Sequence, residues 1–163
     1  HRDLHLSIRR QRQMCIRDRN TNVWAPIFLI KQFVKNLPKK INGSIINIVD
    51  QRVVNLTPFF TTYTLTKSML WTLTQTLALA LAPKIKVNAI GPGPTFPSQR
   101  QTSKQFKNQY KKVPLKKAVD PNEIAEAVLF ILSSNSLTGQ LINVDAGQHL
   151  GWAHASNKKI IDE

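Results

Sequence analysis

The sequence contains little cysteine and no long apolar run. Cys15 is the only cysteine among 163 residues, which excludes an intramolecular disulfide and a cysteine-based metal site. This composition fits a reducing compartment, and we expect no bound metal. No stretch approaches the ~18 uninterrupted apolar residues of a membrane span, and no apolar signal core follows the basic N-terminus. The sequence therefore predicts a cytoplasmic protein with no membrane contact.

Acidic residues are also scarce. Nine Asp and Glu stand against 23 Lys and Arg, which gives a formal net charge of +14. Such an excess is typical of nucleic-acid-binding proteins, because clustered basic residues displace counterions from phosphates. Here, however, residues 1–19 hold six Arg and no Lys, whereas residues 20–163 hold two Arg and 15 scattered Lys. We interpret most of these lysines as solvated surface, leave some anion binding open, and expect no nucleic-acid partner.

The uneven arginine content divides the chain into three parts. Residues 1–19 show neither helical nor strand periodicity and are interpreted as a disordered or foreign segment, similar to translated sequencing-adapter sequence. Residues 20–152 carry the apolar patterns of one domain with a single core. Residues 153–163 are expected to be a polar tail.

The apolar pattern of the middle part alternates between helices and short buried strands. Helices are predicted from Val23 to near Pro38, at 61–82 and at about 121–133. Parallel strands are predicted at 43–50, 85–90 and 141–144. The polar stretch 98–117 is expected to form a mobile helix and loop. A strand, a helix and a strand in succession imply a right-handed parallel crossover, so the expected fold is an open α/β sheet that lacks its first half.

Tyr63 and Lys67 are four residues apart on one expected helix face, where an ammonium can favour the ionised phenol. Alone, this pair is a weak signal, because chance places it in many chains. Asp50 at a strand end, Asn22 before the first helix and the Gly91–Thr95 turn after the next strand strengthen it. Open α/β sheets bind ligands at the carboxyl ends of their strands, and glycines in such a turn let the backbone approach a cofactor.

Asn22, Asp50, Tyr63 and Lys67 follow the order of the Asn, Ser, Tyr and Lys of the short-chain dehydrogenase/reductases, which residues 20–152 resemble. The family usually has Ser where this chain has Asp50. Three segments add a resemblance to the pteridine reductase and dihydrofolate/dihydromonapterin reductase branch: residues 63–67, 70–78 and 147–152. The resemblance implies the C-terminal portion of a Rossmann-type doubly wound parallel sheet, NADP as cofactor and a small pterin as substrate.

The resemblance also implies catalytic roles. Tyr63 would donate a proton, and Lys67 would lower the pKa of Tyr63 and hold the nicotinamide ribose. Asn22 would keep a water that relays protons to Lys67. Asp50 would hydrogen-bond a pterin ring nitrogen, or assist its protonation, while hydride reduces a ring C=N. Asp50 as a mere cap of the next segment, with a plain ketone as substrate, stays open.

Further contacts are implied for the cofactor and for a second subunit. Tyr63 and Lys67 would bind cofactor together with Pro92, Gly93 and Thr95, although a purely structural turn at these positions stays open. The stretch 98–117 would close over substrate as a lid, with Phe96, Phe106 and Tyr110 as possible stacking residues. The two long helices, which carry Trp24 and Trp71, would form a homodimer interface within a dimer or tetramer.

The Gly-rich turn that holds a dinucleotide pyrophosphate is missing from the sequence, so the chain alone is expected to bind cofactor very poorly. The usual Asn-rich strand-end motif of the family is missing as well. Two alternatives remain open. One is a general carbonyl or 3-oxoacyl thioester reductase of the same family, and the other is a non-catalytic half-domain that binds a partner through apolar helix faces.

Overall fold

The computed structural model describes residue 13 and residues 15–57, 60–98 and 101–151. Its helices are the π-helix η1 (Asn20–Trp24), α2 (Ala25–Asn36), the 3-10 helix η2 (Gln51–Val53), α3 (Thr61–Leu81), α4 (Ser103–Tyr110), α5 (Pro121–Ser133) and the 3-10 helix η3 (Gln148–Leu150). Its strands are β1 (Gly43–Ile48), β2 (Ile85–Pro92) and β3 (Leu141–Val144). The α/β class and the predicted order of elements are confirmed, with boundaries that differ by a few residues.

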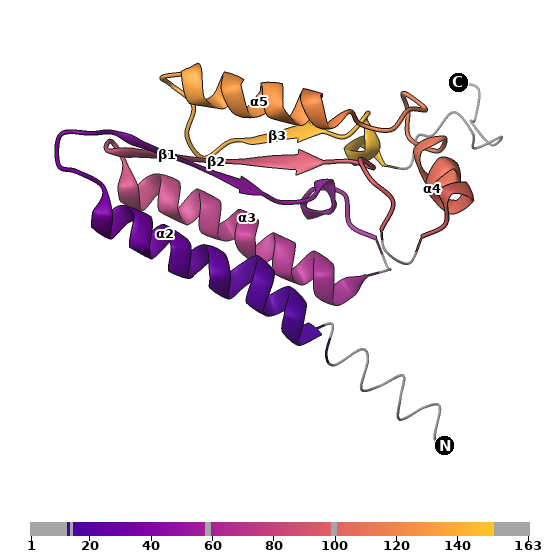
Figure 1. Ribbon diagram of the computed structural model, residues 1–163, viewed down its shortest axis with the longest axis horizontal. Coiled ribbons are helices and arrows are strands. Elements are labelled where there is room, and N and C mark those ends of the chain that lie inside the picture. The colour runs from indigo at the N-terminus through magenta and orange to yellow at the C-terminus, as the bar shows by residue number, and fades with distance from the viewer. Residues whose placement is uncertain (1–12, 14, 58–59, 99–100, 152–163) are drawn as a thin grey trace, which may run out of the picture.

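The three strands form a parallel sheet in the order β1-β2-β3. Ile48 pairs with Ile90, and Pro92 pairs with Val144. Because the strands are parallel, their carboxyl ends meet at one edge of the sheet, as Figure 1 shows. Asp50 follows Ile48 by two residues, just as Pro92 follows Ile90, so the sheet brings Asp50 and the turn after β2 to the same edge.

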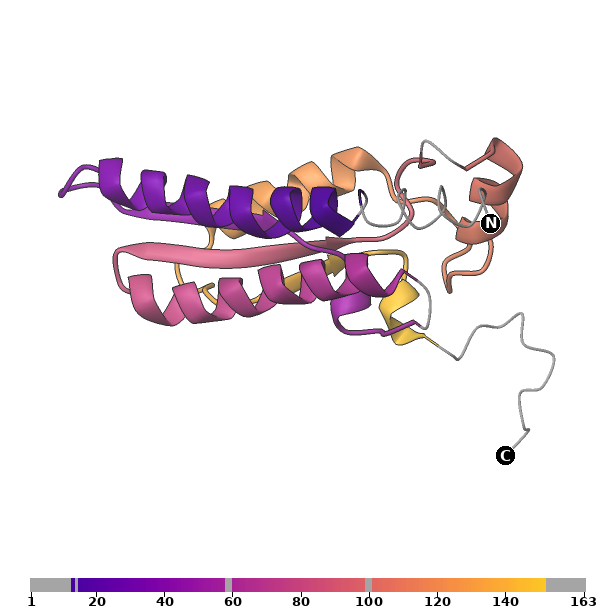
Figure 2. The same cartoon turned by 90° about the horizontal axis from the view of Figure 1, so that it is seen from below.

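Helices cover both faces of the sheet. Figures 1 and 2 show α2 and α3 side by side on one face and α5 on the other. Between α3 and the sheet lie two core clusters, one built on Val49, Leu70 and Ala89 and the other on Ala78, Ile85 and Val87. On the opposite face, α5 buries Ile131 completely. This packing holds α3 against the strands and so fixes the position of the side chains in its first turn.

The buried stripe of α3 is partly polar. Thr66, Leu70, Thr74 and Ala78 are buried, whereas Leu65 and Met69 are 59% and 53% exposed. Thr74 tolerates complete burial because its hydroxyl accepts a hydrogen bond from Nδ2 of Asn47 at 2.9 Å and donates one to the carbonyl of Leu70. A helix that is apolar nearly all round is thus covered on only one side by its own chain.

The start of the described chain is helical. Residues 15–19 are helical and continue into η1 without a break, and the thiol of Cys15 donates to Oγ1 of Thr62 at 3.3 Å. The change in composition at residue 19 therefore does not coincide with a change in secondary structure. Residues 1–12 and 153–163 lie outside the described residues, and the division of the chain into three parts stays a prediction.

No helix within the described ranges combines the length and the apolar character needed to cross a membrane.

Candidate active site

Asp50 and Tyr63 come into direct contact at the carboxyl edge of the sheet. Asp50 leaves β1 in an extended conformation and caps η2, because its Oδ1 accepts a hydrogen bond from the backbone N–H of Arg52 at 2.9 Å. Tyr63 lies in the first turn of α3 and donates its hydroxyl to Oδ2 of Asp50 at 3.2 Å. Two residues that are 13 positions apart in the sequence therefore share one hydrogen bond.

Lys67 and Asn22 flank this pair. Lys67 follows Tyr63 by one helical turn, and its Nζ donates to the carbonyl of Ile48 at 2.9 Å and lies 5.8 Å from the Tyr63 ring centroid. Asn22 lies in the π-turn η1, a feature that is frequent at functional sites, and its Nδ2 donates to Oγ1 of Thr66 at 3.1 Å. The structure thus brings Asn22 close to the helical turn that carries Lys67.

Arg52, which was not among the predicted site residues, also belongs to the cluster. Its Nη1 lies 3.2 Å from Oδ2 of Asp50 in an ion pair. Its guanidinium carbon lies 5.2 Å from the ring centroid of Phe60 and 5.8 Å from that of Tyr63. One signal pointed to this residue: it is one of only two Arg among residues 20–163, in a segment otherwise rich in Lys, and follows Asp50 by two positions.

The surroundings raise the pKa of Tyr63 well above its ordinary value of 10.0. Burial contributes most because it disfavours the phenolate, followed by the charge of Asp50 and its hydrogen bond, whereas Arg52 acts in the opposite direction. Burial also lowers the pKa of Lys67, although the negative charges of Asp50 and Asp18 act to raise it. The net shift of Tyr63 is thus opposite to the lowering that the resemblance implied. A neutral phenol keeps its proton and is available as a donor.

The turn after β2 is fixed mainly by β3. The backbone N–H of Gly93 donates to the carbonyl of Val144 at 3.0 Å, and Oγ1 of Thr95 donates to the carbonyl of Gly93 at 3.1 Å. A Cβ at Gly93 would lie 2.6 Å from Cα of Asp145. Glycine is therefore required here by sheet packing, a reason that differs from the expected approach of a cofactor. Contacts of Pro92, Gly93 and Thr95 with a cofactor stay a prediction.

A groove of about 360 Å³ lies between α2 and β1. Its polar lining includes Asn22, Asn47 and Lys67, and its apolar lining includes Ile30 and Phe33. Lys67 of this lining and the phenol of Tyr63, which lies outside the groove, are groups that can bind sugar hydroxyls, so these two side chains fit the nicotinamide end of a dinucleotide. No strand in the described residues leads through a Gly-rich turn into a helix, so nothing there fits the phosphates.

A backbone hydrogen bond joins the two segments that flank the expected lid, and α4 begins within the lid. The backbone N–H of Val119 donates to the carbonyl of Pro94 at 2.9 Å, and a capping box of Thr102 and Gln105 begins α4. Phe106 and Tyr110 pack edge to face, with ring centroids 5.3 Å apart. These two rings therefore contact each other, and their stacking on a substrate stays a prediction. Among the residues that the structure describes, no three His, Cys, Asp or Glu side chains gather into a candidate metal site.

Comparisons with known proteins place this cluster in context. Residues 10–149 match the sequence model of a family described as enoyl-(acyl carrier protein) reductase. The crystal structure of FolM alternative dihydrofolate reductase 1 from Brucella suis, in complex with NADP, superposes with a TM-score of 0.83 and 44% identity, over 88% of this chain and 58% of that one.

Two relatives have names that refer to different substrates. Pteridine reductase 1 of Leishmania tarentolae is 33% identical over 80% of this chain and 48% of its own length. The 3-oxoacyl-[acyl-carrier-protein] reductase FabG of Buchnera aphidicola subsp. Baizongia pistaciae is 33% identical over 80% of this chain and 56% of its own. The chain therefore spans about half the length of these relatives.

Proposed function

Because the chain belongs to the short-chain dehydrogenase/reductase family of NAD(P)-dependent oxidoreductases, we propose that it forms the catalytic part of an NADP-dependent reductase for a pteridine-like substrate. The hydrogen bond between Tyr63 and Asp50 carries this proposal, because it places a carboxylate beside the proton donor. Pterins contain several ring nitrogens that a carboxyl group can hydrogen-bond, whereas a plain ketone offers only one carbonyl oxygen. The names of the Brucella and Leishmania relatives point to the same substrate class.

The chain's own residues would donate and replace the proton in this reaction. NADPH, when bound, supplies the hydride that adds to the carbon of a ring C=N bond. The O–H bond of Tyr63 breaks, and its proton goes to the ring nitrogen. Asp50 orients the ring through that nitrogen or a neighbouring one, and the ammonium of Lys67 stabilises the phenolate that is left. Lys67 returns a proton to Tyr63, and a water held by Asn22 relays a proton to Lys67 in its place.

Five residues would hold the nicotinamide end of the cofactor. Lys67 and Tyr63 would bind the ribose hydroxyls, and Pro92, Gly93 and Thr95 would contact the carboxamide. The phosphates would need groups that the described residues do not provide. We therefore expect the 163-residue chain by itself to bind NADP very poorly.

A chimera tests the function directly. Residues 20–151 would replace the matching part of the Brucella suis relative, whose similarity over 88% of this chain makes the exchange feasible. We expect this chimera to oxidise NADPH in the presence of a dihydropteridine. The loss of NADPH absorbance measures this oxidation. Tyr63→Phe is expected to abolish turnover and to weaken cofactor binding only slightly, because Lys67 and the turn after β2 keep their contacts. A chimera that binds NADPH but reduces no pterin would rule out the proposed substrate class.

A second candidate, the reduction of a 3-oxoacyl thioester, is favoured by the similarity to the Buchnera relative. The same chimera separates the two, because a thioester ketone needs no carboxylate beside its oxygen. We expect a 3-oxoacyl thioester to be a poor substrate for the wild-type site and Asp50→Ser to improve it. Thioester turnover that exceeds pterin turnover in the wild-type chimera would favour the second candidate.

We also propose that the two long helices mediate a homodimer, alone or within a tetramer. On α2, Phe28 is 60% exposed, and on α3, Leu65 and Met69 are 59% and 53% exposed. Large apolar side chains gathered on adjoining helices are typical of a surface that another subunit covers. Sedimentation analysis of the chain and of Leu65→Lys tests this: the wild type should sediment as an oligomer and the variant as a smaller species. Equal masses would contradict the interface.

A further inference from the structure

We propose that Arg52 is a positioning residue, which holds the carboxylate of Asp50 against Tyr63 and offsets the negative charge that builds up when Tyr63 releases its proton. This inference rests on the proposed function for its chemistry, but the contacts that carry it belong to the chain itself. Arg52 does not contact the reacting atoms; it acts through Asp50 and Tyr63.

Both oxygens of Asp50 are fixed by Arg52. The backbone N–H of Arg52 donates to Oδ1 at 2.9 Å, and its guanidinium Nη1 donates to Oδ2 at 3.2 Å. The hydroxyl of Tyr63 donates to that same Oδ2 at 3.2 Å. A carboxylate held at both oxygens cannot turn away from the phenol without losing one of these bonds. Arg52 therefore sets the direction from which Asp50 meets Tyr63.

The charges around Tyr63 show why a cation is needed there. Release of its proton would leave a phenolate within hydrogen-bond distance of the carboxylate of Asp50, and two anions this close repel each other. Asp18 adds a third negative charge in the surroundings. Lys67 and Arg52 supply positive charge near the Tyr63 ring, each 5.8 Å from its centroid. Arg52 alone of these two also pairs with Asp50.

The surroundings hold the guanidinium in place. Phe60 adopts a left-handed backbone conformation with φ of 59° at the start of α3, and its ring centroid lies 5.2 Å from the guanidinium carbon of Arg52. Arg suits this position better than Lys, because a planar guanidinium can face an aromatic ring and still donate hydrogen bonds from its edge. Most members of the resembled family have Ser in place of Asp50, and a hydroxyl there would need no such counter-charge.

A phenolate titration of the 163-residue chain tests the inference without cofactor or substrate. The chain contains only two tyrosines, so a Tyr110→Phe background lets ultraviolet absorbance report Tyr63 alone. Asp50→Asn is expected to lower the pKa of Tyr63, because the carboxylate raises it. Adding Arg52→Gln to Asp50→Asn should raise it again, since the guanidinium no longer stabilises the phenolate. Stopped-flow pH jumps keep the measurement ahead of alkaline unfolding.

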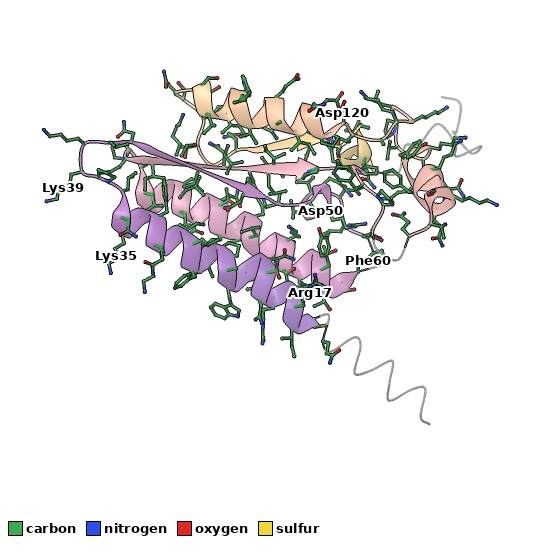
Figure 3. All side chains as sticks on the ribbon, viewed as in Figure 1. Arg17, Lys35, Lys39, Asp50, Phe60 and Asp120 are labelled. Atoms are coloured by element: carbon green, nitrogen blue, oxygen red, sulfur yellow. The ribbon has the colours of Figure 1, made fainter. Side chains whose placement is uncertain are left out.

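Two controls make this result specific. Lys39→Gln in the Asp50→Asn background removes one positive charge at one end of the molecule, well away from Asp50, as Figure 3 shows, and should leave the pKa of Tyr63 unchanged. In the same background, Arg52→Lys keeps the positive charge, so the pKa of Tyr63 should stay near its value in the Asp50→Asn variant. A double variant Asp50→Asn, Arg52→Gln that titrates no higher than Asp50→Asn would overturn the inference.

The chimera described above gives the kinetic test. Arg52→Gln is expected to lower kcat about tenfold, the size expected for one partly screened charge roughly 6 Å away, with KM for NADPH unchanged. Arg52→Lys should recover part of the loss, and an unaltered kcat in Arg52→Gln would overturn the inference. An inactive wild-type chimera would count against the proposed function, while the titration would still decide the role of Arg52.

Discussion

The buried hydrogen bond between Asn47 and Thr74 offers a test of how the site is held in place. It joins β1, which leads into Asp50, to α3, which carries Tyr63. Thr74 is fully buried and Asn47 is 8% exposed, and Nδ2 of Asn47 donates to Oγ1 of Thr74 at 2.9 Å. Thr74→Val keeps the shape of the side chain and removes the hydroxyl, so it takes away the acceptor of the largely buried Asn47 amide.

The magnitude follows from that unpaired amide. Leaving a buried donor unsatisfied costs about 1–3 kcal/mol, and Thr and Val differ little in helix propensity. We expect Thr74→Val to lower the free energy of unfolding by about 2 kcal/mol, which for a chain of this size corresponds to a decrease in Tm of about 4–8 °C. Urea unfolding, monitored by circular dichroism, measures this change in the free energy of unfolding. An unchanged dependence of that free energy on urea concentration indicates that unfolding remains two-state.

Thr76→Val is the matched control. Thr76 lies on the same helix and is exposed, and its hydroxyl donates only to the carbonyl of Thr72 at 2.9 Å. Its loss should change the free energy of unfolding by less than about 0.5 kcal/mol. Replacing both buried partners, as in Asn47→Leu with Thr74→Val, should cost less than the two single changes together. If Thr74→Val costs no more than Thr76→Val, the hydrogen bond does not hold α3 on the sheet.

Two further predictions concern the site itself. The pKa of Tyr63 is raised in the folded chain, so its contribution to stability is complete below the ordinary pKa of 10.0 and is lost as the pH rises above it. Tyr63→Phe removes that loss, and in alkaline unfolding experiments it should retain more of its neutral-pH stability than the wild type or the control Tyr110→Phe. Gly93→Ala should lower the free energy of unfolding by about 2 kcal/mol or more, because the new Cβ meets the backbone of Asp145. Gly43→Ala meets only side chains, which can turn aside, and a thermal melt should show it to be the milder change.

Local signals allowed much of the fold to be predicted. The helix α5 begins where expected, because Asp120 accepts a hydrogen bond from the backbone N–H of Asn122 at 2.9 Å and Pro121 occupies the first turn. The strands were recognisable because β-branched runs between turn residues favour extended backbone. Such signals act within a few residues. They therefore predict a helix or strand and where it ends, but not which other elements pack against it.

The candidate site was predictable in part for the same reason. The spacing of Tyr63 and Lys67 follows from one helical turn, and the position of Asp50 follows from the end of a strand. The parallel sheet then brings them together. The raised pKa of Tyr63 was not predictable, because it depends on burial and on a carboxylate from another element. The sequence showed the ammonium nearby and suggested the opposite shift.

The sequence by itself determined the α/β class and the parallel strands and offered the candidate residues for proton transfer, since these depend on local periodicity and residue chemistry. Only the tertiary structure decided which face of α3 is buried, because that depends on what packs against it: Thr74 is buried beside Asn47, whereas Leu65 remains exposed. The tertiary structure likewise brought Tyr63 against Asp50 and closed Gly93 against Asp145. Burial and long-range electrostatics arise only once distant segments are packed together, and they decide how the residues of this site behave.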